Sequence, residues 1–191
     1  MTQAQLLAAC LRNEPRAQTA FYEHFKKQVW AVCRRYTRTT AEAEDVLQEV
    51  FLKLFKNLQT VTKSESLGGW IHQITVRTAI DYYWVHIKEN NQLNLEEYLT
   101  IVDNHTFDTP LVLDHLSHQD MLAIIHGLPH GYRMVLNLYV IDGYNHAEIA
   151  KMLNISEGTS RSQLSRAKEL FRQKLNLLEK KTLVEPNFSS N

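Results

Sequence analysis

The sequence predicts an all-α fold of two small helical domains joined by an acidic linker. Three observations carry this prediction. Apolar residues recur at helical spacing within residues 1–88, residues 89–120 contain seven acidic residues and no Lys or Arg, and residues 143–167 follow the pattern of a helix, a tight turn and a second helix. The 191 residues suffice for one or two small domains, and no apolar run approaches the length of a membrane span.

The first domain, residues 1–88, is expected to be helical throughout. Pro15 is favoured in the first turn of a helix whose apolar positions then recur at helical spacing. Thr39, followed three residues later by Glu42, has the spacing of a capping box and predicts the start of a second helix. The apolar stripe of that helix consists of Val46, Leu47, Val50, Phe51, Leu54 and Leu58. A third helix is predicted from about Ser66 to Lys88, with Ile71, Ile74 and Thr78 facing inward.

The polar sides of the second and third helices carry candidates for binding. Asp45 and Glu49 are four residues apart, so two like charges share one side of a helix, which weakens an isolated helix slightly and which a cationic partner would offset. Solvation of an exposed acidic face is the alternative. The third helix combines Trp70 and other aromatic residues with Arg77, a mixture that suits stacking on unpaired bases. Aromatic residues at helical spacing more often belong to a core.

The acidic segment separates two basic parts of the chain. The formal net charge is zero, yet residues 1–88 hold 12 basic and 8 acidic residues, and residues 121–191 hold 9 and 6. We interpret residues 89–116 as a flexible linker, residues 117–181 as the second domain and residues 182–191 as a frayed tail. The linker is either a simple solvated spacer or an acidic segment that occupies a nucleic-acid path when no nucleic acid is bound.

The second domain contains a helix-turn-helix pattern. Asn145 and Glu148 predict a capped first helix, Asn154 tolerates the left-handed conformation that ends it, Ile155 fills the corner, and Ser156 caps a second helix. The second helix carries donors and acceptors that suit base edges and phosphates in a DNA major groove: Arg161, Ser162, Gln163, Ser165 and Arg166. An ordinary solvated amphipathic helix is the alternative.

No pattern in the sequence indicates catalysis. Cys10 and Cys33 are too few for a disulfide framework or a zinc site, and we expect both to be buried free thiols. His126 and His130 are separated by a glycine and a proline, so they are not expected to share a helical face. Since there is also no phosphate-binding glycine loop and no nucleophile motif, we expect a protein that is not an enzyme and needs neither a cofactor nor a metal.

Taken together, these segments resemble the extracytoplasmic-function (ECF) sigma factors of the sigma-70 family of bacterial RNA polymerase, over nearly the whole chain. Residues 43–55 resemble the helix of sigma region 2 that binds core polymerase, and residues 70–81 resemble the promoter-melting helix of that region. Leu128 and Pro129, followed by residues 143–167, resemble sigma region 4 with its helix-turn-helix. The three segments occur in the order that the family requires.

The resemblance implies a function and a role for each candidate residue. The chain would direct core polymerase to specific promoters and melt the minus-ten element, with residues 59–69 forming a loop that captures a flipped base. Core polymerase would be bound by Asp45, Gln48, Glu49 and Leu52. The minus-ten element would be approached by Trp70, Arg77, Asp81, Tyr82 and Tyr83. The minus-thirty-five element would be read by Arg161, Ser162, Gln163, Ser165 and Arg166.

The resemblance also implies partners and a place in the cell. We expect an anti-sigma factor, possibly anchored in a membrane, and action in the bacterial cytoplasm at the nucleoid. The sequence shows no signal peptide and suggests no small-molecule substrate. Ser160 departs from the family pattern, which has an apolar core residue there, and we expect its hydroxyl to bond back to a carbonyl of its own helix. The alternative function is a helix-turn-helix activator or repressor that acts without replacing the sigma subunit.

Overall fold

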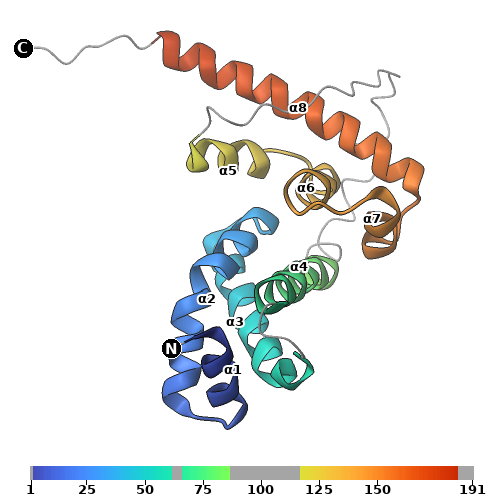
Figure 1. The fold of residues 1–191 in the computed structure, drawn as a ribbon. Helices are drawn as coiled ribbons and strands as arrows, with labels where there is room; N and C mark the ends of the chain where they lie inside the picture. Colours follow the sequence, from blue (N-terminus) through green and yellow to red (C-terminus); the bar gives the residue numbers. More distant parts are fainter. Residues whose placement is uncertain (1, 62–65, 87–116, 185–191) are drawn as a thin grey trace, which may run out of the picture. The chain divides into compact units, whose positions relative to one another are not determined.

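The computed structural model describes residues 2–61, 66–86 and 117–184. The regular elements among these residues are all helical, which confirms the predicted fold class (Figure 1). The chain divides into two compact units, residues 1–100 and 101–191, and each is described here by itself. The predicted linker, residues 89–116, lies outside the described residues. No helix within the described ranges combines the length and apolar character needed to cross a bilayer.

The described residues of the first unit form four α-helices: α1 (Gln3–Leu11), α2 (Pro15–Tyr36), α3 (Thr40–Asn57) and α4 (Leu67–His86), with a 3-10 turn at Leu58–Thr60. Local sequence explains where they begin. α2 starts at Pro15, whose missing N–H costs nothing in a first turn. The predicted capping box of α3 is present, since the Glu42 N–H donates to Thr39 Oγ1 at 3.1 Å and the Glu42 carboxylate accepts from the Thr39 N–H.

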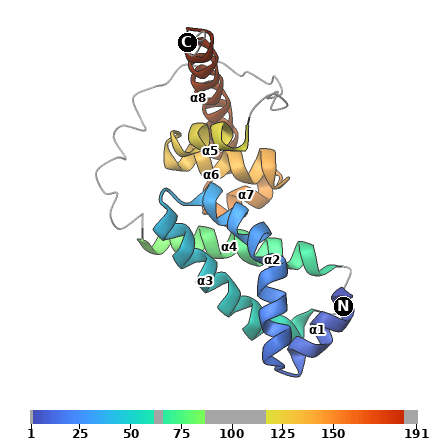
Figure 2. The ribbon, with the colours of Figure 1, turned by 90° about the vertical axis from the view of Figure 1, so that its left-hand side faces the viewer.

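The core of the first unit lies between α2, α3 and α4, which pack pairwise, while α1 packs on α2 (Figure 2). Its apolar stripes have no exposed surface at Phe21, Val29, Val46, Val50, Leu54, Ile71 and Val76. Predicted core residues Leu47 and Ile74 are only half-buried. Cys10 and Cys33 are buried free thiols, as expected, and burial raises the pKa of Cys33 to about 12.

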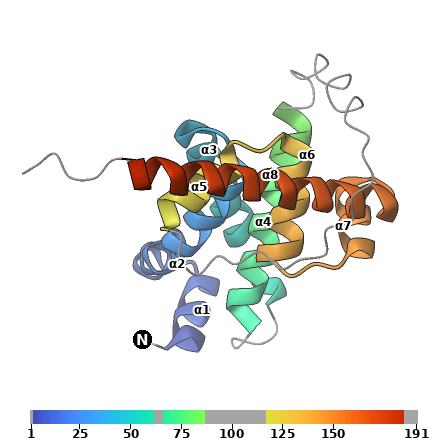
Figure 3. The same cartoon turned by 90° about the horizontal axis from the view of Figure 1, so that it is seen from above.

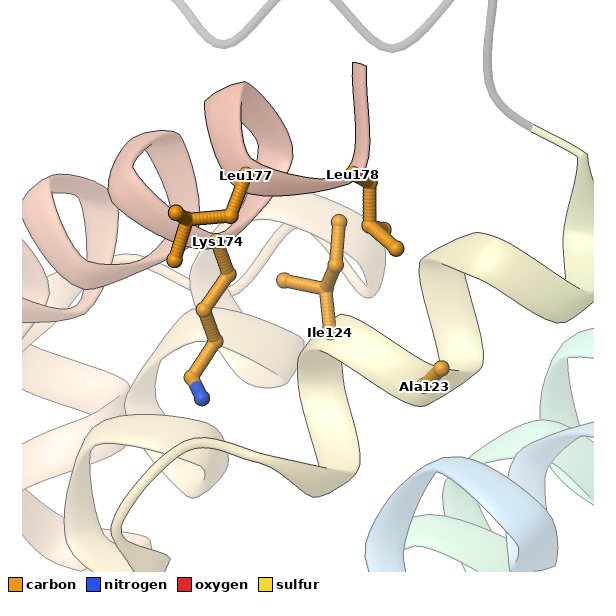
Figure 4. A pocket seen from close by; sticks show the side chains of 5 residues that line it. All are labelled: Ala123, Ile124, Lys174, Leu177 and Leu178. Atoms are coloured by element: carbon orange, nitrogen blue, oxygen red, sulfur yellow. The ribbon is translucent and has the colours of Figure 1, made fainter. Parts of the chain in front are cut away.

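The second unit contains α5 (His118–His126), α6 (His130–Leu136), a π-helical turn (Asn137–Ile141), α7 (His146–Leu153) and α8 (Glu157–Val184). α8 is the scaffold of this unit, because α5, α6 and α7 all pack against it (Figure 3). Its buried side contributes Leu164, Ala167 and Phe171 to the core.

The last helix extends into the predicted tail, residues 182–191. α8 continues to Val184, three residues past the predicted boundary at residue 181. Pro186 is the first residue after this boundary that cannot continue a helix. Residues 185–191 lie outside the described part of the chain.

Candidate partner and nucleic-acid interfaces

The four predicted partner-binding residues of α3 lie on one side of that helix. Positions 45, 48, 49 and 52 follow the spacing of neighbouring turns. Asp45 and Gln48 are exposed, and Leu52 retains 66% of its surface, which is unusual for a leucine in a helix that otherwise supplies the core. Glu49 is half-buried, and Lys53, one turn further on, forms an ion pair with it at 2.9 Å.

Lys53 also joins α3 to α4. Its ammonium lies 3.4 Å from the Asp81 carboxylate, so one cation serves two carboxylates on different helices. Burial lowers the pKa of Lys53, but the hydrogen bond and charge of Glu49, with those of Asp81, outweigh burial and leave that pKa raised. The sequence analysis did not identify Lys53, although its spacing from Glu49 is that of a favourable helical ion pair.

Tyr82 lies at the same seam between α3 and α4. Burial is the largest cause of its raised pKa, followed by the charges of Asp45 and Glu42 and a hydrogen bond to Asp45. Asp81 and Tyr82, predicted to approach DNA with the rest of α4, are therefore in contact with the acidic side of α3. The structure joins the candidate polymerase-binding and minus-ten sites through these two residues.

An apolar groove adjoins the acidic side of α3. It measures about 380 Å³ and lies between α2 and α3. Its lining consists of Tyr22, Glu44, Leu47, Gln48, Phe51, Leu52 and Phe55. Tyr22 packs on Phe51 with ring centroids 4.6 Å apart, which gives the groove a firm aromatic floor. Tyr22 and Phe55 were not predicted as site residues, because their spacing is that of ordinary core positions.

The remaining candidates on α4 form a mixed aromatic and cationic surface. Trp70 is half-buried and Arg77 is exposed, and their separation of seven residues places them on the same side of the helix two turns apart. Arg77 forms no ion pair with any residue that the structure describes. Tyr83 packs edge-to-face on Trp84 with centroids 5.3 Å apart. The loop predicted to capture a base, residues 59–69, lies partly outside the described residues.

The helix-turn-helix has the local geometry that the sequence predicts. The Glu148 N–H donates to Asn145 Oδ1 at 3.0 Å and the Asn145 N–H donates to the Glu148 carboxylate at 2.8 Å, completing the capping box. Asn154 ends α7 in the left-handed conformation, with φ 51° and ψ 49°. Ser156 then accepts the Thr159 N–H at 2.9 Å, so a side-chain cap begins α8.

The predicted DNA-reading residues of α8 divide between two environments. Arg161 and Ser162 are exposed, and Arg161 forms an ion pair with Glu157 at 3.0 Å. Ser165 is half-buried. Arg166 and Gln163 lie toward α6: the Arg166 guanidinium makes a long hydrogen bond of 3.5 Å to the Tyr132 hydroxyl, and the Gln163 amide lies so close to Gly131 that an added Cβ would approach it to 3.3 Å.

Ser160 differs from its prediction. Its side chain is fully buried, and its Oγ lies 2.9 Å from His146 Nδ1 instead of bonding to a carbonyl of its own helix. The His146 ring stacks on Tyr139, with centroids 4.6 Å apart and planes 24° apart. Burial and the charge of Arg161 lower the pKa of His146. Sequence reasoning missed His146, because its partner is 14 residues away and no short-range spacing links them.

The described residues show no metal centre. Among them, no three His, Cys, Asp or Glu side chains are arranged to hold a metal ion. His126 is the last residue of α5 and His130 the first of α6, so the two do not share a helix, as expected. The candidate residues form an acidic and apolar surface on α3, and mixed cationic and polar surfaces on α4 and α8.

Comparison with known proteins gives matches in both units of the chain. The family model for Sigma-70 region 2 matches residues 21–84, and that for Sigma-70, region 4 matches residues 118–171. The ECF RNA polymerase sigma factor SigW of Bacillus subtilis (strain 168) is 26% identical over 158 residues, covering 79% of this chain and 84% of that protein. The ECF RNA polymerase sigma-E factor of Escherichia coli (strain K12) is 23% identical over 186 residues, covering 92% and 95%.

A solved structure shares the fold. The sigma factor RpoE from Bartonella quintana, solved in complex with the anti-sigma factor NepR, superposes with a TM-score of 0.52 at 16% sequence identity. The match covers 82% of this chain and 97% of that one.

Proposed function

Because the chain belongs to the sigma-70 family as an ECF sigma factor, we propose that its surfaces divide the work of promoter recognition between its two units. Such a factor directs core RNA polymerase to specific promoters and enables transcription to initiate. The observation that carries the proposal is the order of the two matched regions, each of which coincides with a candidate surface of its own unit.

In this proposal, the exposed side of α3 binds a cationic helix of core polymerase. Asp45 and Glu49 supply negative charge, Gln48 supplies polar contacts, and Leu52 supplies an apolar contact beside the groove. Apolar burial provides most of the affinity of such an interface, whereas the carboxylates chiefly select and orient a cationic partner. The partner replaces Lys53 at Glu49, so that Lys53 keeps Asp81 as its counter-ion.

Charge reversal tests this assignment. Asp45→Lys combined with Glu49→Lys places two cations where a cationic partner must approach, and we expect loss of binding to purified core polymerase in a pull-down. The matched control reverses two exposed acidic residues of the same unit, Glu14→Lys with Glu23→Lys, and should bind as wild type. Equal binding by both double variants would contradict the role of α3.

The other two surfaces contact promoter DNA in this proposal. Trp70 stacks on an unpaired base of the melted minus-ten element and Arg77 binds the backbone of the displaced strand, because aromatic and cationic side chains together hold single strands. Asp81 and Tyr82 hold α4 against α3, and Tyr83 supports the neighbouring aromatic surface. In the second unit, α8 contacts the minus-thirty-five element as duplex through the exposed Arg161 and Ser162. The half-buried Ser165, Arg166 and Gln163 complete this surface at the border with α6.

An anti-sigma factor completes the proposed set of partners. The solved sigma factor that shares this fold is bound to one. Leu52, beside the groove on α3, is the most exposed large apolar side chain among the described residues of the first unit. We therefore expect an anti-sigma factor to cover this side of α3 and exclude polymerase. The chain would then act in the bacterial cytoplasm, at the nucleoid once it is bound to polymerase.

Run-off transcription tests the proposed function as a whole. Purified core RNA polymerase, with and without this protein, transcribes a library of genomic fragments, and the 5′ ends of the transcripts are mapped. Protein-dependent starts that share two upstream elements are the expected result. Sequence-specific duplex binding without any initiation would instead indicate an activator or repressor that does not replace the sigma subunit.

A further inference from the structure

We propose that His146 is a positioning residue for the DNA-reading helix, holding α8 at a fixed distance from α7 through its contact with Ser160. This inference rests on the proposed role of the second unit in reading the minus-thirty-five element. It adds a residue that does not belong to the predicted DNA-contacting set and acts on the DNA through α8.

The contact joins the starts of the two helices. His146 is the first residue of α7, and Ser160 lies in the first turn of α8, where its N–H donates to the Ser156 carbonyl at 3.0 Å. The distance from His146 Nδ1 to Ser160 Oγ is 2.9 Å, a good hydrogen bond in which either atom can donate. Ser160 directly precedes Arg161 and Ser162, so any shift of Ser160 displaces the exposed pair that follows it.

Two further observations show that the contact is restrained. The imidazole is stacked on Tyr139, whose ring lies 4.6 Å away, so the ring plane is held from a third segment of the chain. Among the α8 residues whose side chains are described, Ser160 is the only fully buried polar one, and Leu164, Ala167 and Phe171 occupy the same side. A buried hydroxyl is costly unless it is hydrogen-bonded, so His146 compensates the desolvation of Ser160.

A hydrogen bond constrains this position differently from an apolar contact. Apolar packing tolerates small shifts, because dispersion is non-directional and is summed over many atoms. A hydrogen bond weakens steeply when its distance or angle changes. The His146–Ser160 pair therefore sets the relation between α7 and α8 more narrowly than a small buried alanine would.

The charges around His146 make the proposed role depend on pH, which a purely structural contact would not. Arg161 and Lys168 of α8 disfavour its protonated form, Glu157 of α8 favours it, and Glu148 lies two residues further along α7. Tyr139 packs on the ring from the π-helical turn. The neutral ring is thus the form suited to this site, and protonation would place a cation beside Arg161, the residue proposed to contact DNA.

The experiment measures discrimination by the full-length protein in complex with core polymerase. The probes are a duplex carrying the minus-thirty-five element mapped by the run-off experiment and the same duplex with that element scrambled. We expect Ser160→Ala and His146→Phe each to lower the ratio of the two affinities about three- to tenfold, and the double variant to lower it no further. His146→Asn, which keeps a polar atom near the Nδ1 position, should restore part of the ratio.

Two measurements separate positioning from general damage. Thr75→Ala removes a buried hydroxyl that donates to the Ile71 carbonyl in the first unit, and it should leave the ratio unchanged. Lowering the pH below about 6.5 should reduce the ratio for wild type more than for His146→Phe, because only wild type gains a cation at position 146.

The outcomes are distinguishable. The proposed pairing would be overturned if both folded single variants kept the wild-type ratio of affinities for the two duplexes. It would also be overturned if the reductions of that ratio multiplied in the double variant. Thermal unfolding of each variant identifies any that fail to fold, and Ser160→Ala, the removal of one oxygen atom from a helix, then decides the question alone. If wild type itself does not distinguish the two duplexes, the proposed reading of the minus-thirty-five element fails, and this inference fails with it.

Discussion

Arg161 and Arg166 show how the surroundings of a single residue decide what it can contact. Arg161 is exposed and forms an ion pair with Glu157, one turn before it, which DNA can readily replace. Arg166 is half-buried and reaches back toward Tyr132 of α6. Both guanidinium groups can bind a guanine edge with two hydrogen bonds, but only Arg161 is displayed without rearrangement.

Alanine substitution separates base contacts from backbone contacts on α8. Arg161→Ala should weaken binding to the mapped promoter by about 1–3 kcal/mol and relax selectivity at one base pair, because a two-bond contact to a base is lost. Arg166→Ala should do the same at a neighbouring base pair. Lys168→Ala is the comparison: Lys168 is a cation of the same helix outside the predicted base-reading set, so its loss should weaken binding to all duplexes alike, as the loss of a phosphate contact does. The measurement is the affinity of each variant for promoters that carry single-base changes. If the division between base and backbone contacts is wrong, all three alanine variants, or none of them, will change selectivity.

His146 predicts how stability depends on pH. Its pKa in the folded protein is lowered from the usual 6.5, so the unfolded chain takes up the proton first as the pH falls. The free energy of unfolding of the second unit is therefore unaffected by this group well above pH 6.5 and decreases as the pH falls through that value. Urea unfolding between pH 5 and 8 should show the loss in wild type and a smaller loss in His146→Phe. Identical pH profiles would show that this imidazole is not the titrating group; His126 and His130 are present in both proteins.

The elements differ in how much of them could be predicted from sequence. Helix starts depend on groups within three residues of each other, which is why the capping boxes at Thr39 and Asn145 were predictable. The bond of Lys53 to Asp81 spans 28 residues and that of His146 to Ser160 spans 14, so both depend on helix packing that no local pattern encodes. The division of α8 into an exposed side and a side facing α6 was missed for the same reason.

The turn between α7 and α8 depends on one residue that can adopt a left-handed backbone. Asn154 has φ 51°, where an alanine is strained and a glycine is not. Asn154→Ala should lower the free energy of unfolding by about 1–2 kcal/mol, whereas Asn154→Gly should be near neutral. Chemical unfolding measured by circular dichroism tests both. Since residue 154 is exposed, a large loss for the glycine variant would mean that the side chain, and not the backbone conformation, stabilises the turn.

At the scale of the whole molecule, charge is distributed unevenly along the chain, although the formal net charge is zero. The basic excess lies in residues 1–88 and 121–191, and seven acidic residues lie in the segment between them. Nucleic-acid affinity depends on the number of phosphates that cations neutralise and on the field of the whole chain. A chain with this distribution should bind duplex weakly when alone, which suits a protein whose promoter contacts are made within the polymerase complex.

Neutralising the segment should reveal the basic excess. The six acidic residues of 89–116 can be replaced together by their amides: Glu89→Gln, Glu96→Gln, Glu97→Gln, Asp103→Asn, Asp108→Asn and Asp114→Asn. The variant carries six fewer negative charges at unchanged side-chain size. We expect it to bind a scrambled duplex more tightly than wild type at 50 mM salt, and the difference to shrink as salt rises toward 200 mM, because screening weakens contributions beyond a Debye length of about 8–10 Å.

The salt series also distinguishes two roles for the segment. If the variant's higher affinity for the scrambled duplex disappears at higher salt, the six charges act through a general electrostatic effect. A gain that persists at high salt indicates that the acidic segment competes directly for the DNA-binding surface of α8, since a displaced competitor changes affinity even when long-range charge is screened. Equal affinities of the two proteins at 50 mM salt would contradict both roles and leave the segment as a spacer whose charge does not matter for duplex binding.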